Sequence, residues 1–144
     1  MENRYQKDDC LFCKIAKGEV SSYKVYEDDE IYAFLDVSPA SKGHTLVITK
    51  EHFDNFLMVP RDLVEKAFTV AQKIGQVLVS EFHAEGVNIL TNVNKAAGQS
   101  VMHFHIHVIP RYSNDTLSLE FKPKMIEKFN LPVLASELNS YLKK

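Results

Sequence analysis

The chain has no long apolar run and no marked excess of charge of one sign. Nowhere do about 18 uninterrupted apolar residues occur, so an ordinary transmembrane helix is excluded, and the polar residues 1–9 lack the apolar segment of a secretory signal. The 17 basic and 19 acidic side chains give a formal net charge of −2, which argues against a broad electrostatic contact with duplex nucleic acid. We therefore expect a cytoplasmic protein that binds neither membranes nor nucleic acid, and any nucleotide that it binds should be small.

Cysteine is scarce, because the 144 residues contain only Cys10 and Cys13. In a reducing compartment their C-x-x-C spacing indicates metal ligation or redox chemistry rather than a structural disulfide. That spacing is short and non-specific, so a pair of thiols without metal is the alternative. Apolar residues make up 45% and charged residues 25%, which are ordinary globular values, and no repeat, low-complexity tract or linker interrupts the chain. A single domain over residues 1–144 is expected.

Hydrophobic periodicity and turn signals predict short strands combined with few helices. Strands are predicted at 23–27, 30–35, 44–49, 87–93 and 101–110. Helices are predicted at 10–17, ended by Gly18, from a capping box at Asp62 and Glu65 to about Phe82, and from about Pro132, where Leu134, Leu138, Tyr141 and Leu142 share one side. Strands in series with few helices favour an antiparallel α+β domain over a doubly wound fold.

The strand at 101–110 concentrates most of the chemistry, because His103, His105 and His107 alternate with apolar residues. Successive side chains of a strand point to opposite faces, so the three imidazoles are expected on one face and Phe104, Ile106 and Val108 in the core. Pro110 has no N–H and is expected to end the strand pairing. His83, near the end of the long helix, matches no motif and is expected to be a solvated surface residue.

Three interpretations compete for these histidines. Core packing gains nothing from three titratable rings, so a purely structural role is disfavoured. A metal centre with three imidazole ligands and an open position for water is a second possibility, although three ligands on one strand are harder to bring together than two. The favoured interpretation is nucleophilic catalysis, in which a neutral ring nitrogen of the central His105 attacks phosphorus and a backbone carbonyl holds the proton of its other nitrogen. His107 then helps to place the phosphate.

The tripeptide Gly98-Gln99-Ser100 directly precedes the histidines. Glycine permits a close backbone approach, and free N–H groups, the Gln99 amide and the Ser100 hydroxyl are suited to surround phosphate oxygens. Most such stretches are simply turns, so the position next to the histidine strand is what gives this one weight.

The run Gly98-Gln99-Ser100-Val101-x-His103-x-His105-x-His107-Val108-Ile109-Pro110-Arg111 closely resembles the histidine-triad (HIT) family of nucleotide hydrolases and transferases. Further matches are Tyr26-Glu27-Asp28-Asp29, Ala33-Phe34-Leu35-Asp36, Gly43-His44-x-Leu46-Val47-Ile48 and Lys50-x-His52. The resemblance implies a HIT core at about 10–112 with an extension at 113–144. It also implies an α+β fold with a five-stranded antiparallel sheet, one long helix and short terminal helices, normally paired into a homodimer.

The same resemblance assigns roles to individual residues. It implies attack by His105 on the α-phosphate of a purine nucleoside monophosphate derivative, an AMP or GMP compound, with His44, His107 and Ser100 supporting catalysis. The residues implied in nucleotide binding, besides His105 and His107, are Phe34, Asp36, Val37, Asn92, Gly98, Gln99, Ser100 and Val101. Asp36 corresponds to the acid that binds the ribose hydroxyls, although an Asp in this position is also a common turn former.

The segment Cys10-Leu11-Phe12-Cys13-Lys14-Ile15 looks like the bacterial-type Hint branch of the family, in which a cysteine pair and two histidines surround zinc. Carried over, the zinc ligands are Cys10, Cys13, His52 and His103. Two thiolates and two imidazoles form a closed tetrahedral set, which is typical of a structural zinc rather than a catalytic one. No organic cofactor is implied.

The leading functional hypothesis is an enzyme, a purine nucleoside phosphoramidase of the Hint type that cleaves a P–N bond through a nucleotidyl-histidine intermediate. A dinucleoside polyphosphate hydrolase with the same nucleophile and a nucleotide phosphate as leaving group is the close alternative. A zinc-bearing nucleotide sensor or interaction module, with incidental turnover, is the alternative from a different class.

Overall fold

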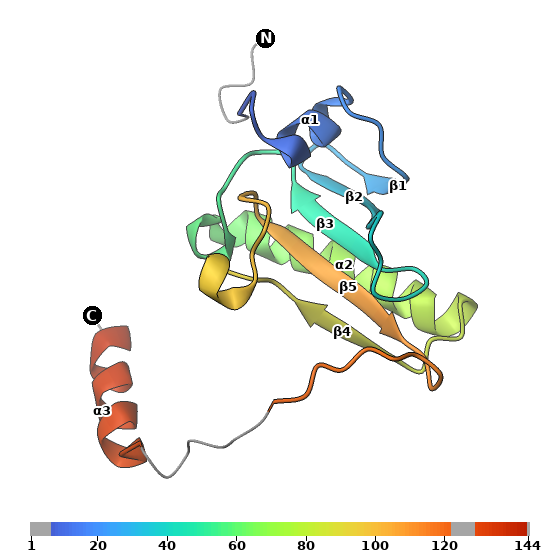
Figure 1. The fold of residues 1–144 in the computed structure, drawn as a ribbon. Coiled ribbons are helices and arrows are strands. Elements are labelled where there is room, and N and C mark those ends of the chain that lie inside the picture. The colour runs from blue at the N-terminus through green and yellow to red at the C-terminus, as the bar shows by residue number, and fades with distance from the viewer. Residues whose placement is uncertain (1–6, 122–128, 144) are drawn as a thin grey trace.

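The computed structural model describes residues 7–121 and 129–143. In chain order its elements are α1 (Leu11–Lys17), β1 (Lys24–Glu27), β2 (Ile31–Leu35), β3 (Thr45–Thr49), the 3₁₀ turn η1 (Phe56–Met58), α2 (Arg61–Glu81), β4 (Gly86–Leu90), the 3₁₀ turn η2 (Lys95–Ala97), β5 (His105–Arg111) and α3 (Leu131–Leu142). The strands form one antiparallel sheet in the order β1-β2-β3-β5-β4, as Figure 1 shows. The predicted α+β fold with a five-stranded antiparallel sheet is therefore confirmed.

The sheet separates two apolar clusters, one on each face. On one face α2 packs through Ala67 and Val70 against the predicted inward residues Phe104, Ile106 and Val108, which are fully buried. The other face packs Phe12 and Ile15 of α1 against a second set of strand residues, Tyr32, Phe34, Leu46 and Ile48. His107 lies opposite Leu46 and His105 opposite Ile48 in the pairing of β3 with β5, so both histidines belong to the α1 face. Alternation along β5 thus places His105 and His107 on one face of the sheet, as expected.

The prediction that His103 belongs to this strand is wrong, although its side chain lies on the α1 side as expected, with its ring centroid 6.0 Å from that of Phe12. β5 begins only at His105, and residues 101–103 form a bend in which the His103 N–H donates to the Val101 carbonyl at 2.9 Å. The Phe104 N–H donates to the Phe53 carbonyl at 2.7 Å, which ties the bend to the segment after β3 instead of to a neighbouring strand. His103 is fully buried on the α1 side against Phe12 and Cys13, and only His105 and His107 belong to β5.

Pro110 does not end the strand, contrary to expectation. β5 continues to Arg111, and Pro110 pairs with Val87 of β4. The pairing of β5 with β3 stops at Val108, and the Pro110 carbonyl accepts a hydrogen bond from the Ser41 hydroxyl at 2.6 Å instead of from a strand N–H. The nitrogen of Pro110 faces the side where the ladder has already finished, so its missing N–H costs no strand hydrogen bond.

The long helix α2 begins without the predicted capping box. Its N-cap is Pro60, which makes no side-chain cap, and Asp62 lies inside the first turn, where a carboxylate complements the helix dipole. The Glu65 carboxylate accepts from the Arg61 side chain at 3.0 Å rather than reaching back to the cap. α1 ends as predicted at Gly18, whose φ of +83° is left-handed.

The remaining boundaries differ by a few residues from those predicted, most of all in β4, which ends at Leu90 rather than at residue 93. His83 is exposed, as expected, but it has a left-handed φ of +62° just after the C-cap of α2. Within the described ranges, no helix is both long enough and apolar enough to cross a membrane.

Candidate active site and metal centre

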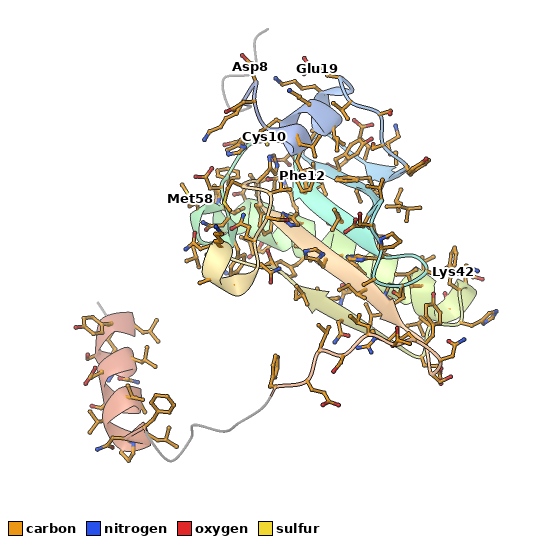
Figure 2. The ribbon with its side chains drawn as sticks, viewed as in Figure 1. Asp8, Cys10, Phe12, Glu19, Lys42 and Met58 are labelled. Atoms are coloured by element: carbon orange, nitrogen blue, oxygen red, sulfur yellow. The ribbon has the colours of Figure 1, made fainter. Side chains whose placement is uncertain are left out.

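His105 is held in one tautomer by the bend that precedes it. Its Nδ1 lies 2.7 Å from the carbonyl oxygen of His103, and a carbonyl can only accept, so Nδ1 carries the proton. In the neutral ring Nε2 therefore has a free lone pair. The edge of the Phe12 ring of α1 packs against the imidazole, with ring centroids 5.1 Å apart and the planes at 89°. Figure 2 labels Phe12 where α1 meets the sheet.

His44 and His107 form a second hydrogen-bonded pair on the same face of the sheet. The Ala40 N–H donates to His44 Nδ1 at 2.9 Å, so the neutral His44 ring carries its proton on Nε2. His44 Nε2 in turn lies 3.0 Å from His107 Nδ1, which must accept, so the His107 proton is on its own Nε2. The backbone thereby determines both tautomers, and His107, whose ring centroid lies 5.0 Å from that of His105, has an N–H available as a donor.

Burial keeps these imidazoles uncharged at neutral pH. Burial, followed by the neighbouring His105 and His44, lowers the pKa of His107 to about 4. Burial also lowers the pKa of His105 and that of His44, against an opposing effect of the Asp36 carboxylate. A neutral His105 with a free Nε2 is the protonation state that a nucleophile requires.

A cavity of about 430 Å³ opens onto His105 and His107, within the size range of small-ligand sites. Of the residues expected to bind nucleotide, Phe34, Asp36, Val37, Ser100 and Val101 line this cavity with the two histidines, whereas Asn92, Gly98 and Gln99 do not. Asp36 is the turn former considered for this position, because one carboxylate oxygen accepts the Ser38 N–H at 2.8 Å, and the residue also borders the cavity.

Sequence reasoning missed the apolar wall opposite the strand. Leu11, Phe12 and Ile15 of α1, with Val20 after it, line the same cavity as Phe34. These residue types are common in hydrophobic cores, and they face the cavity only because α1 packs on the sheet. The spacing of Leu11, Phe12 and Ile15 on one side of a short helix was the available signal, but it does not distinguish a pocket wall from a core contact.

The Gln99 side chain does not face the cavity, contrary to the expectation for its amide. It is buried, and its Nε2 donates to the carbonyls of Asp54 at 2.6 Å and Val101 at 3.0 Å, while its Oε1 accepts from the Asn94 N–H at 2.7 Å. All three bonds hold the loop before the histidines in shape. Gly98, with a left-handed φ of +94°, lets the chain turn there, so the loop reaches the site through Ser100 and Val101.

The four residues proposed to bind zinc converge beside this loop. Candidate ligand atoms of Cys10, Cys13, His52 and His103 all lie within 4.8 Å of one another. His103 Nδ1 is 3.4 Å from each sulfur, and His52 Nδ1 is 3.3 Å from the Cys13 sulfur. A tetrahedral zinc with Zn–S of about 2.3 Å and Zn–N of about 2.0–2.1 Å separates sulfur and nitrogen ligands by roughly 3.5 Å, which matches these distances.

The other nitrogen of each candidate histidine ligand has a hydrogen-bond acceptor. His103 Nε2 donates to the Thr49 carbonyl at 2.7 Å, and His52 Nε2 to the Asp54 carboxylate at 2.7 Å, so both Nδ1 atoms present lone pairs to the cysteines. Burial lowers the pKa of His103 to about 4 and raises that of the Cys13 thiol to about 11. A thiol with that pKa ionises at neutral pH only beside a cation, so the donor set fits zinc.

A metal centre on the three strand histidines is not supported by this geometry, because His103 faces the cysteines and not His105. A second group of possible ligands, Asp36, His44 and His107, lies closer to the cavity. His44 Nδ1 accepts a backbone N–H, however, so its Nε2 holds a proton that a metal ion would have to displace. The geometry therefore separates a nucleophile site from a metal site, joined through the backbone and side chain of His103.

Comparison with known proteins agrees with this arrangement. The model of the HIT domain family matches residues 17–114. The chain belongs to the HIT family. "Protein hit" of Bacillus subtilis is 47% identical over 105 residues, 73% of this chain and 72% of that protein. The HIT relative named adenosine 5'-monophosphoramidase HNT1 in Candida albicans is 37% identical over 111 residues, covering 74% of this chain and 73% of that one.

Solved HIT structures share the fold closely. A protein from Streptococcus mutans UA159 superposes with a TM-score of 0.87 at 39% identity, covering 99% of this chain and 90% of its own. A zinc-bound histidine triad family protein from Mycobacterium smegmatis superposes with a TM-score of 0.73 at 36% identity, covering 92% and 97% of the two chains. HIT proteins thus include at least one that binds zinc.

Proposed function

We propose that this HIT protein is a nucleotide-binding hydrolase that cleaves purine nucleoside phosphoramidates through a nucleotidyl intermediate on His105. The observation that carries the proposal is the hydrogen bond from His105 Nδ1 to the His103 carbonyl, which leaves the lone pair of Nε2 free beside the cavity. The name of the Candida albicans relative supports a P–N bond as the target.

The cavity offers complementary groups for each part of an AMP or GMP derivative. Phe34 and Val37, with Leu11 of α1, provide apolar contacts for a purine, and the Asp36 carboxylate has an oxygen suited to accept ribose hydroxyls. Ser100 and Val101 border the cavity on the side of the histidines, where the α-phosphate would lie for attack by His105. Asn92 and Gly98, which lie outside the lining, would act through the shape of the loop.

The reaction proceeds in two displacements. His105 Nε2 attacks the α-phosphorus, an N–P bond forms, and the bond from phosphorus to the amine breaks with the electron pair leaving on nitrogen. The amine must gain a proton to depart. That proton comes from solvent water, and the exposed hydroxyl of Ser100, which borders the cavity, would relay it to the leaving nitrogen. The N–H of His107 Nε2 supports the phosphate charge, and water then hydrolyses the nucleotidyl-histidine to release the monophosphate.

A side-by-side rate comparison tests the leaving group. Adenosine phosphoramidate and a lysine–AMP conjugate are expected to be cleaved with a kcat/KM at least about tenfold above that for diadenosine polyphosphates, a difference of about 1.4 kcal/mol in transition-state stabilisation. The opposite order would favour the dinucleoside polyphosphate hydrolase. Tight nucleotide binding without turnover of any of the three would favour the sensor or interaction module instead.

The pH profile follows from the lowered histidine pKa values. Because protonated His107 can no longer accept from His44 Nε2, activity is lost on the acid side, and the pKa of about 4 places that loss below the ordinary histidine range. We expect kcat/KM for adenosine phosphoramidate to stay flat from about pH 8 to pH 6 and to fall below about pH 5. The same histidines also destabilise the fold as the pH falls from about 6.5 to 4, because they take up protons more readily in the unfolded chain. Rates measured again after return to pH 7 therefore serve as a control for unfolding. An acid limb at or above pH 6.5 would contradict the buried, neutral site.

We also propose that the protein is a homodimer and that zinc is a structural component, one ion per chain. β4 is an outer strand of the sheet, and Ile89 on it and Val79 on α2 are both about half exposed. An outer strand flanked by exposed apolar side chains is suited to pair with a second copy. The closed set of two sulfurs and two nitrogens supports the structural role of the metal.

A further inference from the structure

The C-terminal helix α3 is exposed along its whole length. Every residue from 129 to 143 is exposed. Figure 1 shows α3 away from the body of the molecule, beyond β4 and on the side of the sheet opposite β1. A 12-residue helix is only marginally stable by itself in water, so a helix in this position needs a surface to pack on.

One side of α3 is strongly apolar. Leu131, Leu134, Leu138 and Leu142 follow each other at intervals of three or four residues, so they form one stripe, and between 41% and 84% of each side chain is exposed. If packing buries roughly 100 Å² of accessible surface for each leucine, the stripes of two helices bury on the order of 800 Å² together. The surfaces that they pack on lose a similar accessible area. The sum lies within the range of about 1,200–2,000 Å² that stable interfaces bury.

The position and charge of α3 indicate what covers this stripe. A second copy that pairs its β4 with this β4 would extend the sheet into the region where α3 lies. A groove beside that strand is lined by residues without charge, namely Gln72, Gly75, Gln76, Val79, Val87 and Ile89. The segment Leu131–Leu142 is likewise nearly uncharged, with one Glu and no Lys or Arg, which is unlike a helix that binds anionic membranes.

We propose that α3 packs, through its leucine stripe, on a second copy of this chain, so that two copies exchange their C-terminal helices. The inference rests on the homodimer proposed above and goes beyond it, because α3, and not only pairing of the outer strand β4, then holds the two copies together. In a two-fold assembly the exchange is reciprocal, and each copy both gives and receives a helix.

Matched charge substitutions test the stripe. The double variant Leu134→Glu/Leu138→Glu is expected to raise the Kd of the dimer at least about tenfold, measured by sedimentation equilibrium. The control Ser136→Glu/Ser140→Glu adds the same charge at the same spacing on the polar side of the helix and is expected to leave the Kd unchanged. Since α3 stands apart from the body, both variants should still show a cooperative thermal unfolding transition of the five-stranded sheet and its helices. This measurement checks that they fold.

A crosslinking experiment distinguishes packing of α3 on a second copy from packing of α3 on its own copy. Isotopically heavy and unlabelled copies, each carrying Leu138→p-benzoylphenylalanine, are mixed and irradiated, and the crosslinked peptides are sequenced. Crosslinks that join a heavy and an unlabelled peptide support the proposal. Crosslinks within single copies only, or a dimer that survives Leu134→Glu/Leu138→Glu unchanged, would overturn it while leaving the homodimer intact. Binding of α3 to anionic vesicles in place of a second copy would likewise overturn the proposal alone, whereas a monomeric wild-type protein would overturn both the proposal and the homodimer.

Discussion

Replacing His105 with alanine is expected to reduce kcat/KM for adenosine phosphoramidate by at least about 10³-fold, because no other group in the site offers a free ring nitrogen in a defined tautomer. His107 Nδ1 is occupied by His44, and His103 is turned to the cysteines. Binding of AMP, measured by calorimetry, is expected to change by less than about tenfold, or 1.4 kcal/mol, because Phe34 and Asp36 keep their positions.

A matched control separates this effect from a general loss of histidine. His83→Asn changes an exposed histidine and keeps a residue type that tolerates the left-handed φ of +62°, so both rate and binding should stay at the wild-type level. A covalent test follows from the same chemistry, since wild-type protein denatured in alkali during turnover, where an N–P bond to histidine survives, should carry a nucleotide on His105. Turnover that persists in His105→Ala would rule out this residue as the nucleophile.

The sequence predicted the face of β5 that carries the chemistry, because alternation is a local property of an extended chain. His105 and His107 lie on that face, and Phe104, Ile106 and Val108 enter the core. The same reasoning wrongly extended the strand to His103. The backbone bends there because the Phe104 N–H bonds the distant Phe53 carbonyl, which no local pattern encodes. The resemblance to HIT proteins, rather than periodicity, associated His103 with the cysteines.

The limits of sequence reasoning are similar at the cavity. Phe34, Asp36 and Val37 could be named from a motif that spans the end of β2, but the wall made by α1 depends on how a seven-residue helix packs on the sheet. Gln99 was expected at the phosphate because its residue type suits an anion, whereas tertiary contacts use its amide to brace the loop. A side chain with three possible backbone partners cannot be assigned between these roles without the fold.

The metal site gives the second large effect, and Cys10 allows it to be measured cleanly. The Cys10 sulfur both belongs to the candidate zinc site and caps α1, because it accepts from the Cys13 N–H at 3.3 Å. Serine is a good N-cap, so Cys10→Ser keeps the cap of α1 while it removes a thiolate ligand. We expect the wild-type protein to hold about one zinc per chain by elemental analysis and the variant to hold almost none.

Loss of the metal should destabilise the protein far more than it slows the reaction. The site joins α1, the segment containing His52 and the bend at His103, so its loss should lower the free energy of unfolding by at least about 3 kcal/mol. Removing zinc from wild-type protein with a chelator should have the same effect as Cys10→Ser, and the chelator should not change the variant further. Additive losses would mean that the serine acts through packing or the cap.

Activity at a temperature where the chelated protein remains folded tests the division of roles between the two sites. The carbonyl of His103, not its ring, holds the His105 proton, so the tautomer of the nucleophile survives without metal as long as the bend at 101–103 persists. We therefore expect kcat to fall by less than about tenfold, mainly because α1 packs less firmly on the cavity. If cleavage instead stops in folded, zinc-free protein and returns with added zinc, the metal takes part in the chemistry, and attack by His105 alone is not the mechanism.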